Sequence, residues 1–231
     1  MDTNTVRDTI TIKCQQCGEE YEFNVYNVIN LQKDKDLYEP LFSLDIFKHT
    51  CEKCGHLNIV QYDMMVVDSY KKYMIFLFGP ERMNFFKESV EKYLKTLEEK
   101  NSQEFQVLKE NIQHTRVVNS INDLKEKLLI FDYDLNDKII ELIKRSLYEN
   151  KLLDEKEFPY ILFNAIDQDK LAFVCIGGEN NVNTKEIGIS IEFYNKILDS
   201  LGDKIKEFKE LDFPLIDKNW ASNLVDKKEW K

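Results

Sequence analysis

Two short stretches of sequence decide the fold: residues 14–18 read CQQCG, and residues 51–55 read CEKCG. Two residues separate the cysteines of each pair, a spacing that lets one tight turn aim both sulfur atoms at a single ion. The glycine after the second cysteine accepts the positive φ that such a turn often needs. Four thiolates form the tetrahedral ligand set of structural zinc sites. The sequence therefore predicts a structural site for one Zn²⁺ per chain, with the ligands Cys14, Cys17, Cys51 and Cys54.

Strand-like segments flank both cysteine pairs. They are rich in β-branched and aromatic residues, and one of them alternates apolar with polar side chains. The predicted strands cover residues 9–12, 21–28, 58–62 and 72–77. The 33 residues between Cys17 and Cys51 exceed the spacing of about 15–20 in common zinc sites. A long hairpin can still return the second pair to the first, so residues 1–80 are predicted to form a zinc-ribbon-like antiparallel β module.

The rest of the chain mixes helical and strand patterns. Apolar residues at spacings of three and four predict a helix over residues 81–100, within a helical connector that spans 81–111. Beyond it, strands are predicted at 115–118, 160–163, 171–176 and 187–191, and helices at 121–131, 135–147 and up to Leu201. Ser120 with Asp123, and Asp134, are the predicted helix caps. We expect an α+β domain over residues 112–231 and an α+β fold for the whole chain.

Composition and charge limit the classes of function. The 231 residues include 32 Lys or Arg and 42 Asp or Glu, which gives a net charge of −10. This charge disfavours binding to nucleic acid or to an anionic membrane. The first residues do not have the pattern of a secretory signal, and no apolar run approaches the about 20 residues of a membrane span. We therefore expect a cytoplasmic protein, in which reduced cysteines favour metal binding over disulfides.

Redox chemistry is the alternative use of the two cysteine pairs. A pair of thiols can form a disulfide, and oxidation can release a bound metal ion. A thioredoxin-like pair begins a helix after a strand, whereas strand-like residues flank both pairs here. The pattern favours metal binding. Cys175 lies in an apolar strand and is interpreted as a buried core thiol.

Histidines and acidic residues form weaker candidate sites. His49 and His56 flank the second cysteine pair, but four cysteines already complete a ligand set, so both are interpreted as surface residues or neighbours of the ligands. Asp132, Asp134 and Asp137 begin like a calcium loop but lack its glycine and its last glutamate. This segment is interpreted as a helix-capping turn.

Residues 11 to about 78 resemble the CpXC domain, a bacterial and archaeal family that has two cysteine pairs. The resemblance rests on the aromatic strand after Cys17, residues 41–47 and the strands after Cys54, and residues 115–118, 123–131 and 137–142 resemble the region that accompanies this domain. The family usually has a proline after the first cysteine of each pair, where this chain has Gln15 and Glu52. Proline shapes the turn but binds no metal. The resemblance implies a zinc-ribbon-like module followed by an α+β region, and no established activity.

Three functions are compatible with these observations. The favoured one is a cytoplasmic, non-enzymatic zinc protein, an interaction or regulatory module whose α+β region binds a protein partner or a small ligand. The second is a hydrolase-type enzyme with a site in residues 112–231, supported by carboxylates and by the Gly-Gly loop at 177–181, but without a paired nucleophile and base. The third is a zinc-ribbon regulator that binds nucleic acid, which the negative charge disfavours.

Overall fold

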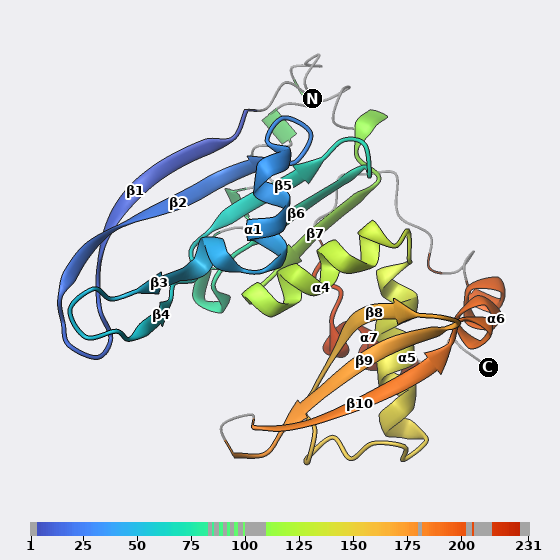
Figure 1. The fold of residues 1–231 in the computed structure, drawn as a ribbon. Coiled ribbons are helices and arrows are strands. Elements are labelled where there is room, and N and C mark those ends of the chain that lie inside the picture. The colour runs from blue at the N-terminus through green and yellow to red at the C-terminus, as the bar shows by residue number, and fades with distance from the viewer. Residues whose placement is uncertain are drawn as a thin grey trace. The chain divides into compact units, whose positions relative to one another are not determined.

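The structure is a computed structural model that describes residues 4–82, 110–179, 182–201, 205 and 214–226, together with positions 85, 88, 89, 92, 95, 96 and 99. The chain divides into two compact units. The first comprises Met1–Lys125 and Lys209–Phe213, and the second comprises Glu126–Phe208 and Pro214–Lys231. Both units combine helices with a β-sheet (Figure 1), which confirms the predicted α+β class.

A five-stranded mixed sheet forms the framework of the first unit. Its strand order is β1-β2-β5-β6-β7. The strands are β1 (Val6–Lys13), β2 (Glu20–Asn30), β5 (Met64–Asp68), β6 (Tyr73–Leu77) and β7 (His114–Val118). The pairs β1·β2 and β5·β6 are antiparallel, whereas β2·β5 and β6·β7 are parallel. The predicted antiparallel module is thus a mixed sheet, because two of its connections cross over between strands that run in the same direction.

The boundary between the units differs from the predicted segments 1–80, 81–111 and 112–231. Strand β7 pairs with β6 in the register Tyr73↔His114 to Leu77↔Val118, so residues beyond 112 complete the N-terminal sheet. The boundary falls inside helix α4 (Ile121–Asp132), between Lys125 and Glu126. The pattern of residues 115–118 predicted a strand correctly, but a local pattern does not identify the partner of a strand.

Central strands of this sheet are buried on both faces. Val66, Val67, Ile75, Leu77 and Val117 are fully buried. Such strands are continuous apolar runs without alternation. The sequence analysis predicts β6 from such a run, at 72–77, but does not include β5. The edge strand β1, by contrast, is almost entirely exposed.

Between β2 and β5 the chain forms a short helical segment and a second hairpin. The segment contains η1 (Lys35–Leu37), α1 (Tyr38–Phe42) and η2 (Asp45–Phe47), and the hairpin consists of β3 (Lys48–Thr50) and β4 (Leu57–Ile59). Leu37, Leu41, Ile46 and Phe47 are buried and anchor the segment. The β1–β2 hairpin carries the first cysteine pair in its turn and the β3–β4 hairpin carries the second, and Figure 1 shows the two turns side by side.

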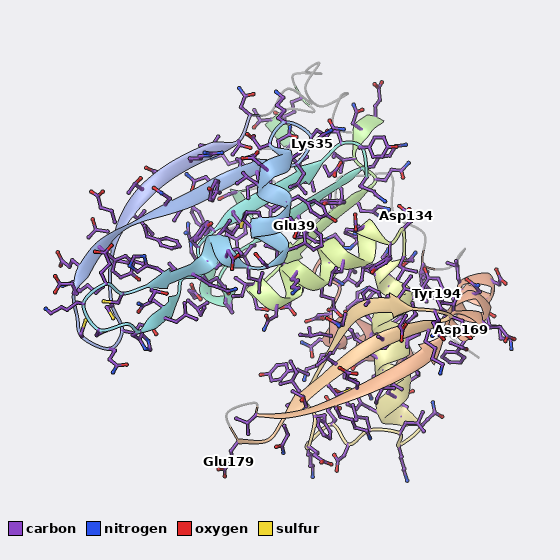
Figure 2. The ribbon with its side chains drawn as sticks, in the orientation of Figure 1. Lys35, Glu39, Asp134, Asp169, Glu179 and Tyr194 are labelled. Atoms are coloured by element: carbon purple, nitrogen blue, oxygen red, sulfur yellow. The ribbon has the colours of Figure 1, made fainter. Side chains whose placement is uncertain are left out.

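The second unit contains an antiparallel sheet in the order β10-β9-β8. Its strands are β8 (Tyr160–Asp167), β9 (Lys170–Gly177) and β10 (Asn183–Ser190), and its helices are the end of α4, α5 (Asp137–Glu149), α6 (Ile191–Leu201) and α7 (Lys218–Asp226). The predicted hairpin around Asp167-Gln168-Asp169 is confirmed, with Gln168 at a positive φ of 53°. Figure 2 labels Asp169 in this turn.

One of the two predicted helix caps is correct. The hydroxyl of Ser120 accepts a hydrogen bond from the backbone N–H of Asp123 at 3.1 Å, as expected at the start of α4. The cap of α5 is Asn136, whose side chain accepts from Lys138 and Ile139, and not Asp134. Asp134 has a φ of 54° and lies in the turn between the helices, a conformation in which a cap residue is not found.

Some predicted features fall outside the described residues. The helix predicted at 81–100 lies largely there, although positions 85, 88, 89, 92, 95, 96 and 99 are helical. Gly202, which follows the helix predicted to run up to Leu201, also lies there. Among the residues that the structure does describe, no helix has both the length and the apolar composition needed to cross a membrane.

Candidate metal centre

The four cysteines of the two pairs converge at the turns of the two hairpins. Their sulfur atoms all lie within 4.8 Å of one another and form a group that can hold a metal ion. Two of the short distances join sulfur atoms of different pairs: Cys14 and Cys54 are 3.6 Å apart, and Cys17 and Cys51 are 3.7 Å apart. Figure 2 shows sulfur atoms gathered at this end of the first unit. The structure thus brings together every cysteine that the sequence predicts as a ligand, while their binding of a metal stays a prediction.

The two turns have the same backbone geometry. In the first, the N–H of Gly18 donates to the carbonyl of Cys14 at 2.9 Å, and the N–H of Cys14 donates to the carbonyl of Glu19. In the second, Gly55 donates to Cys51 at 2.8 Å in the same way. Gly18 and Gly55 have φ values of 73° and 72°, which residues with a side chain rarely adopt. The sequence analysis predicted this role for both glycines.

Each turn presents one buried and one exposed cysteine. Cys14 and Cys51, the first of each pair, are 3% exposed, whereas Cys17 and Cys54 are open to solvent. An ion held between them would therefore be covered by protein on one side and reachable by water-soluble reagents on the other.

A buried asparagine on β4 links the two turns. The side chain of Asn58 accepts a hydrogen bond from the backbone N–H of Gln15 at 2.9 Å. Its amide nitrogen lies 3.7 Å from the sulfur of Cys14 and also donates to the carbonyls of His56, at 3.2 Å, and His49, at 3.4 Å. Asn58 is 2% exposed. The sequence analysis missed this residue, because an asparagine four positions after a cysteine carries no signal of its own.

Aromatic side chains support the second hairpin. The ring of His49 stacks on Tyr21 of β2 with a centroid distance of 3.6 Å, and its edge faces Phe23. Phe47 and Phe23 both pack against Tyr62. His49 is therefore part of the packing between the hairpins, and His49 and His56 are not members of the converging group. This agrees with their interpretation as neighbours of the ligands.

Burial and hydrogen bonds shift the thiol pKa values of Cys14 and Cys54 in opposite directions. Burial raises the pKa of Cys14, but the backbone N–H groups of Cys17 and Gln16 and the amide of Asn58 outweigh it and lower the pKa to about 6. For Cys54, the backbone N–H of His56 favours the thiolate, but burial and the neighbouring cysteine sulfurs raise the pKa to about 12. Four thiolates cannot form side by side unless a cation offsets their repulsion. The cluster therefore has the chemistry of a cation site.

An exposed ion pair also joins the two turns. Lys53, between the cysteines of the second pair, lies 2.6 Å from Glu19, which follows the first pair. This contact raises the pKa of Lys53. The side chain of Lys53 is 61% exposed and that of Glu19 is 50% exposed, so this ion pair contributes little to stability.

The acidic residues singled out in the sequence do not form a calcium site. Within the described residues, Asp132, Asp134 and Asp137 do not converge as metal ligands. Asp137 is 1% exposed and lies 3.0 Å from Lys127.

Cys175 is fully buried in β9, and burial raises its pKa, as expected of a core thiol.

Asp137 belongs to a buried network of charged side chains in the second unit. Its members are Glu126 and Lys127 of α4 and Asp137, Glu141 and Lys144 of α5, all 1–7% exposed. The ammonium group of Lys144 lies 2.7 Å from Glu126 and 2.8 Å from Glu141, and that of Lys127 lies 3.5 Å from Glu141. Sequence reasoning missed this network, because charged residues on a helix are expected to face solvent.

Glu126 is the most constrained member of the network. It also accepts a hydrogen bond from the backbone N–H of Phe163 on β8. Burial raises the pKa of Glu126, although Lys144 and Lys127 partly offset this effect. Burial lowers the pKa of Lys144, but Glu126 and Glu141 outweigh it and raise that pKa above its ordinary value. The network is held together by contacts among its own members and by the hydrogen bond from Phe163.

Comparison with known protein families gives one match. The model of the family described as CpXC protein matches residues 12–144, more than half of the chain. The matched range contains both cysteine pairs, β7, α4 and the first part of α5. It confirms the resemblance inferred from the cysteine pairs. The comparisons with curated proteins and with solved structures found no match.

Proposed function

The chain belongs to the CpXC family, and we propose that it is a cytoplasmic, non-enzymatic interaction or regulatory protein with a structural zinc ion. One Zn²⁺ per chain would be bound by the thiolates of Cys14, Cys17, Cys51 and Cys54. The observation that carries the proposal is the convergence of four sulfur atoms from two hairpin turns within 4.8 Å of one another.

Zinc fits the ligand type and the sulfur spacing. A tetrahedral zinc ion with Zn–S bonds of about 2.3 Å separates its sulfur ligands by about 3.8 Å. Two sulfur–sulfur distances between the pairs are 3.6 and 3.7 Å. Four cysteine ligands leave no coordination position for water, so the ion would support the fold rather than activate a nucleophile.

The size of the second hairpin supports a structural role. Strands β3 and β4 have only three residues each, and an isolated two-stranded hairpin is marginally stable at best. An ion shared with the turn of the β1–β2 hairpin would fasten β3 and β4 to the main sheet. The binding free energy would then contribute to folding, as in other small metal-binding modules.

The environment of the carboxylates weighs against the hydrolase alternative. Glu126, Asp137 and Glu141 are buried and paired with Lys127 and Lys144. A general acid or base must reach the substrate, and these groups are directed toward one another. We place contact with a protein partner or a small ligand in the α+β region.

Metal content and thiol protection, measured together, test the proposal. Untagged protein would be purified without added metal or chelator. We expect one zinc per chain and four thiols that react only after a strong chelator has removed the ion, and a Cys175→Ser chain should keep its zinc. Protein without metal, with disulfides among the paired cysteines, would contradict the proposal and support redox chemistry.

A gel-shift titration tests the nucleic-acid alternative. Electrostatic binding to DNA or RNA is strongest at low salt. Because the net charge of the chain is −10, we expect the zinc-loaded chain to cause no gel shift of DNA or of RNA at low salt. A salt-dependent shift that is lost on removal of zinc would favour a nucleic-acid-binding regulator instead.

A further inference from the structure

We infer that Asn58 is a positioning residue of the metal centre, which holds the two cysteine turns in register and donates an N–H···S hydrogen bond to Cys14. The inference rests on the proposed zinc site and adds to it a residue outside the ligand set. It is carried by the contacts of one buried side chain with both turns.

The contacts of Asn58 use both ends of its amide group. The carbonyl oxygen accepts from the N–H of Gln15 at 2.9 Å, and so binds the first turn. The nitrogen carries two hydrogens and faces the carbonyls of His56 and His49, on either side of the second cysteine pair, at 3.2 and 3.4 Å, so with the sulfur of Cys14 as a third acceptor one hydrogen is shared. A carboxylate would keep the first contact and lose the others, and an aliphatic side chain would lose all of them.

The same nitrogen also faces a proposed ligand atom. It lies 3.7 Å from the sulfur of Cys14, and Cys14 itself is 3% exposed. An N–H donor stabilises a thiolate and reduces the negative charge that this sulfur presents to a metal ion. Asn58 therefore acts on the position of the ligands and on the electronic character of one of them.

Burial explains why these contacts matter for affinity. Asn58 is 2% exposed, so water cannot replace its hydrogen bonds when the side chain is changed. Two turns that are already connected lose less freedom when an ion binds to both. Changes to residues that support metal ligands typically weaken metal binding by about 10–100-fold.

Two near-isosteric substitutions separate the contributions. Asn58→Leu removes every hydrogen bond, and Asn58→Asp removes the donors and adds a carboxylate beside the sulfur of Cys14. His56→Ala is the matched control, because it keeps the backbone carbonyl that Asn58 contacts. Lys53→Ala is the second control, because it breaks the exposed ion pair between the turns and leaves the N–H···S contact in place.

Zinc affinity and a cobalt spectrum of the full chain are the two measurements. Competition with a chromophoric chelator should give a zinc dissociation constant about 10–100-fold higher for both Asn58 variants. The controls should stay within about fivefold of the unmodified chain. In Co²⁺-loaded protein, the sulfur-to-metal charge-transfer band should shift in both Asn58 variants, and in neither control. A residue with only a packing role would not shift that band.

The outcomes distinguish this inference from the proposed function. Unchanged affinity and an unchanged cobalt spectrum in Asn58→Asp, with one zinc in the unmodified chain, would overturn the role of Asn58 and leave the zinc site intact. No zinc in the unmodified chain would overturn both. If Asn58→Leu fails to fold, Asn58→Asp still decides, because it preserves the size and shape of the side chain.

Discussion

The cysteine cluster of the first unit and the charged network of the second are both groups of ionisable side chains, but their charges are balanced differently. The four ligand candidates are all acids, and two of them, Cys17 and Cys54, are exposed. The network combines three carboxyl groups with two ammonium groups and is almost completely buried. Among the described residues, the cysteine cluster can hold a cation from outside the chain, whereas the network pairs its carboxylates with its own ammonium groups.

This difference separates a binding site from a part of the core. Groups of one sign repel each other when they ionise, and in the cysteine cluster burial and hydrogen bonds with the other cysteines raise the pKa of Cys54. In the network, burial raises the pKa of Glu126, and the ammonium groups of Lys144 and Lys127 offset part of this effect. The balance of charge within a cluster therefore indicates whether the cluster is suited to bind a charged ligand. Three experiments test this comparison, in order of decreasing expected effect.

The largest effect should follow the loss of one proposed ligand. Cys14→Ser is expected to lose the zinc ion, and structural zinc sites contribute apparent binding free energies of about 10–16 kcal/mol. Hydrogen exchange should show lost protection in β3 and β4, while β8 and β9 stay protected. The matched variant Cys175→Ser should keep the zinc and lower the stability of the second unit by about 1–3 kcal/mol, because it buries a hydroxyl. Native exchange in zinc-free Cys14→Ser would contradict the structural role.

Removing an internal cation should have the next largest effect. Lys144→Met leaves Glu126 and Glu141 buried without their ammonium partner. Breaking a buried ion pair from one side costs about 3–5 kcal/mol, so denaturant unfolding should show a loss of this size, with zinc content unchanged. Lys196→Met, which breaks an exposed ion pair with Glu192 on α6, should change nothing measurable. A similarly small loss for Lys144→Met would mean that the network does not need its own cations.

The smallest effect is a pH dependence. The pKa of Glu126 is raised in the folded state above its ordinary value of 4.5, so above pH 4.5 the folded chain keeps a proton that the unfolded chain releases. This contribution to stability is present below pH 4.5 and is lost as the pH rises, by at most about 1.4 kcal/mol per pH unit. Urea unfolding at several pH values should show this slope, and Glu126→Gln should remove it.

Glu192→Gln provides the control of opposite sign. Its hydrogen bond with Lys196 lowers the pKa of Glu192, so its small contribution is present above its unfolded-state pKa and is lost as the pH falls. A slope that persists in Glu126→Gln would assign the pH dependence to other groups.

Local patterns in the sequence predicted much of the fold and the cysteine cluster. Alternation predicted β2, the spacing of the cysteines predicted both turns, and the residues around Gln168 predicted the β8–β9 hairpin. These features depend on neighbours along the chain. The parallel pairing of β2 with β5 depends on segments far apart in sequence, and no local pattern encodes it.

Asn58 in the cysteine cluster and Lys144 in the network could not be predicted from the sequence, and the physical reason is the same for both. Asn58 and Lys144 are polar residues that normally face solvent, and only the folded chain brings each of them within hydrogen-bonding distance of its partners. The spacing of cysteine pairs predicts their role from the sequence, whereas the role of an asparagine or a lysine depends on its packing in the folded chain. Charge balance could be judged only after the members of each cluster were known.

The close approach of Cys17 to Cys51 has a consequence for the unfolded chain. An ion bound to both as the chain folds would act as a cross-link that closes a ring containing η1, α1 and η2. The entropy of closing a flexible ring grows only with the logarithm of its length, and doubling the length costs about 0.6 kcal/mol. The long insert between the cysteine pairs is therefore inexpensive, and this ring can accept further insertions without loss of the ion.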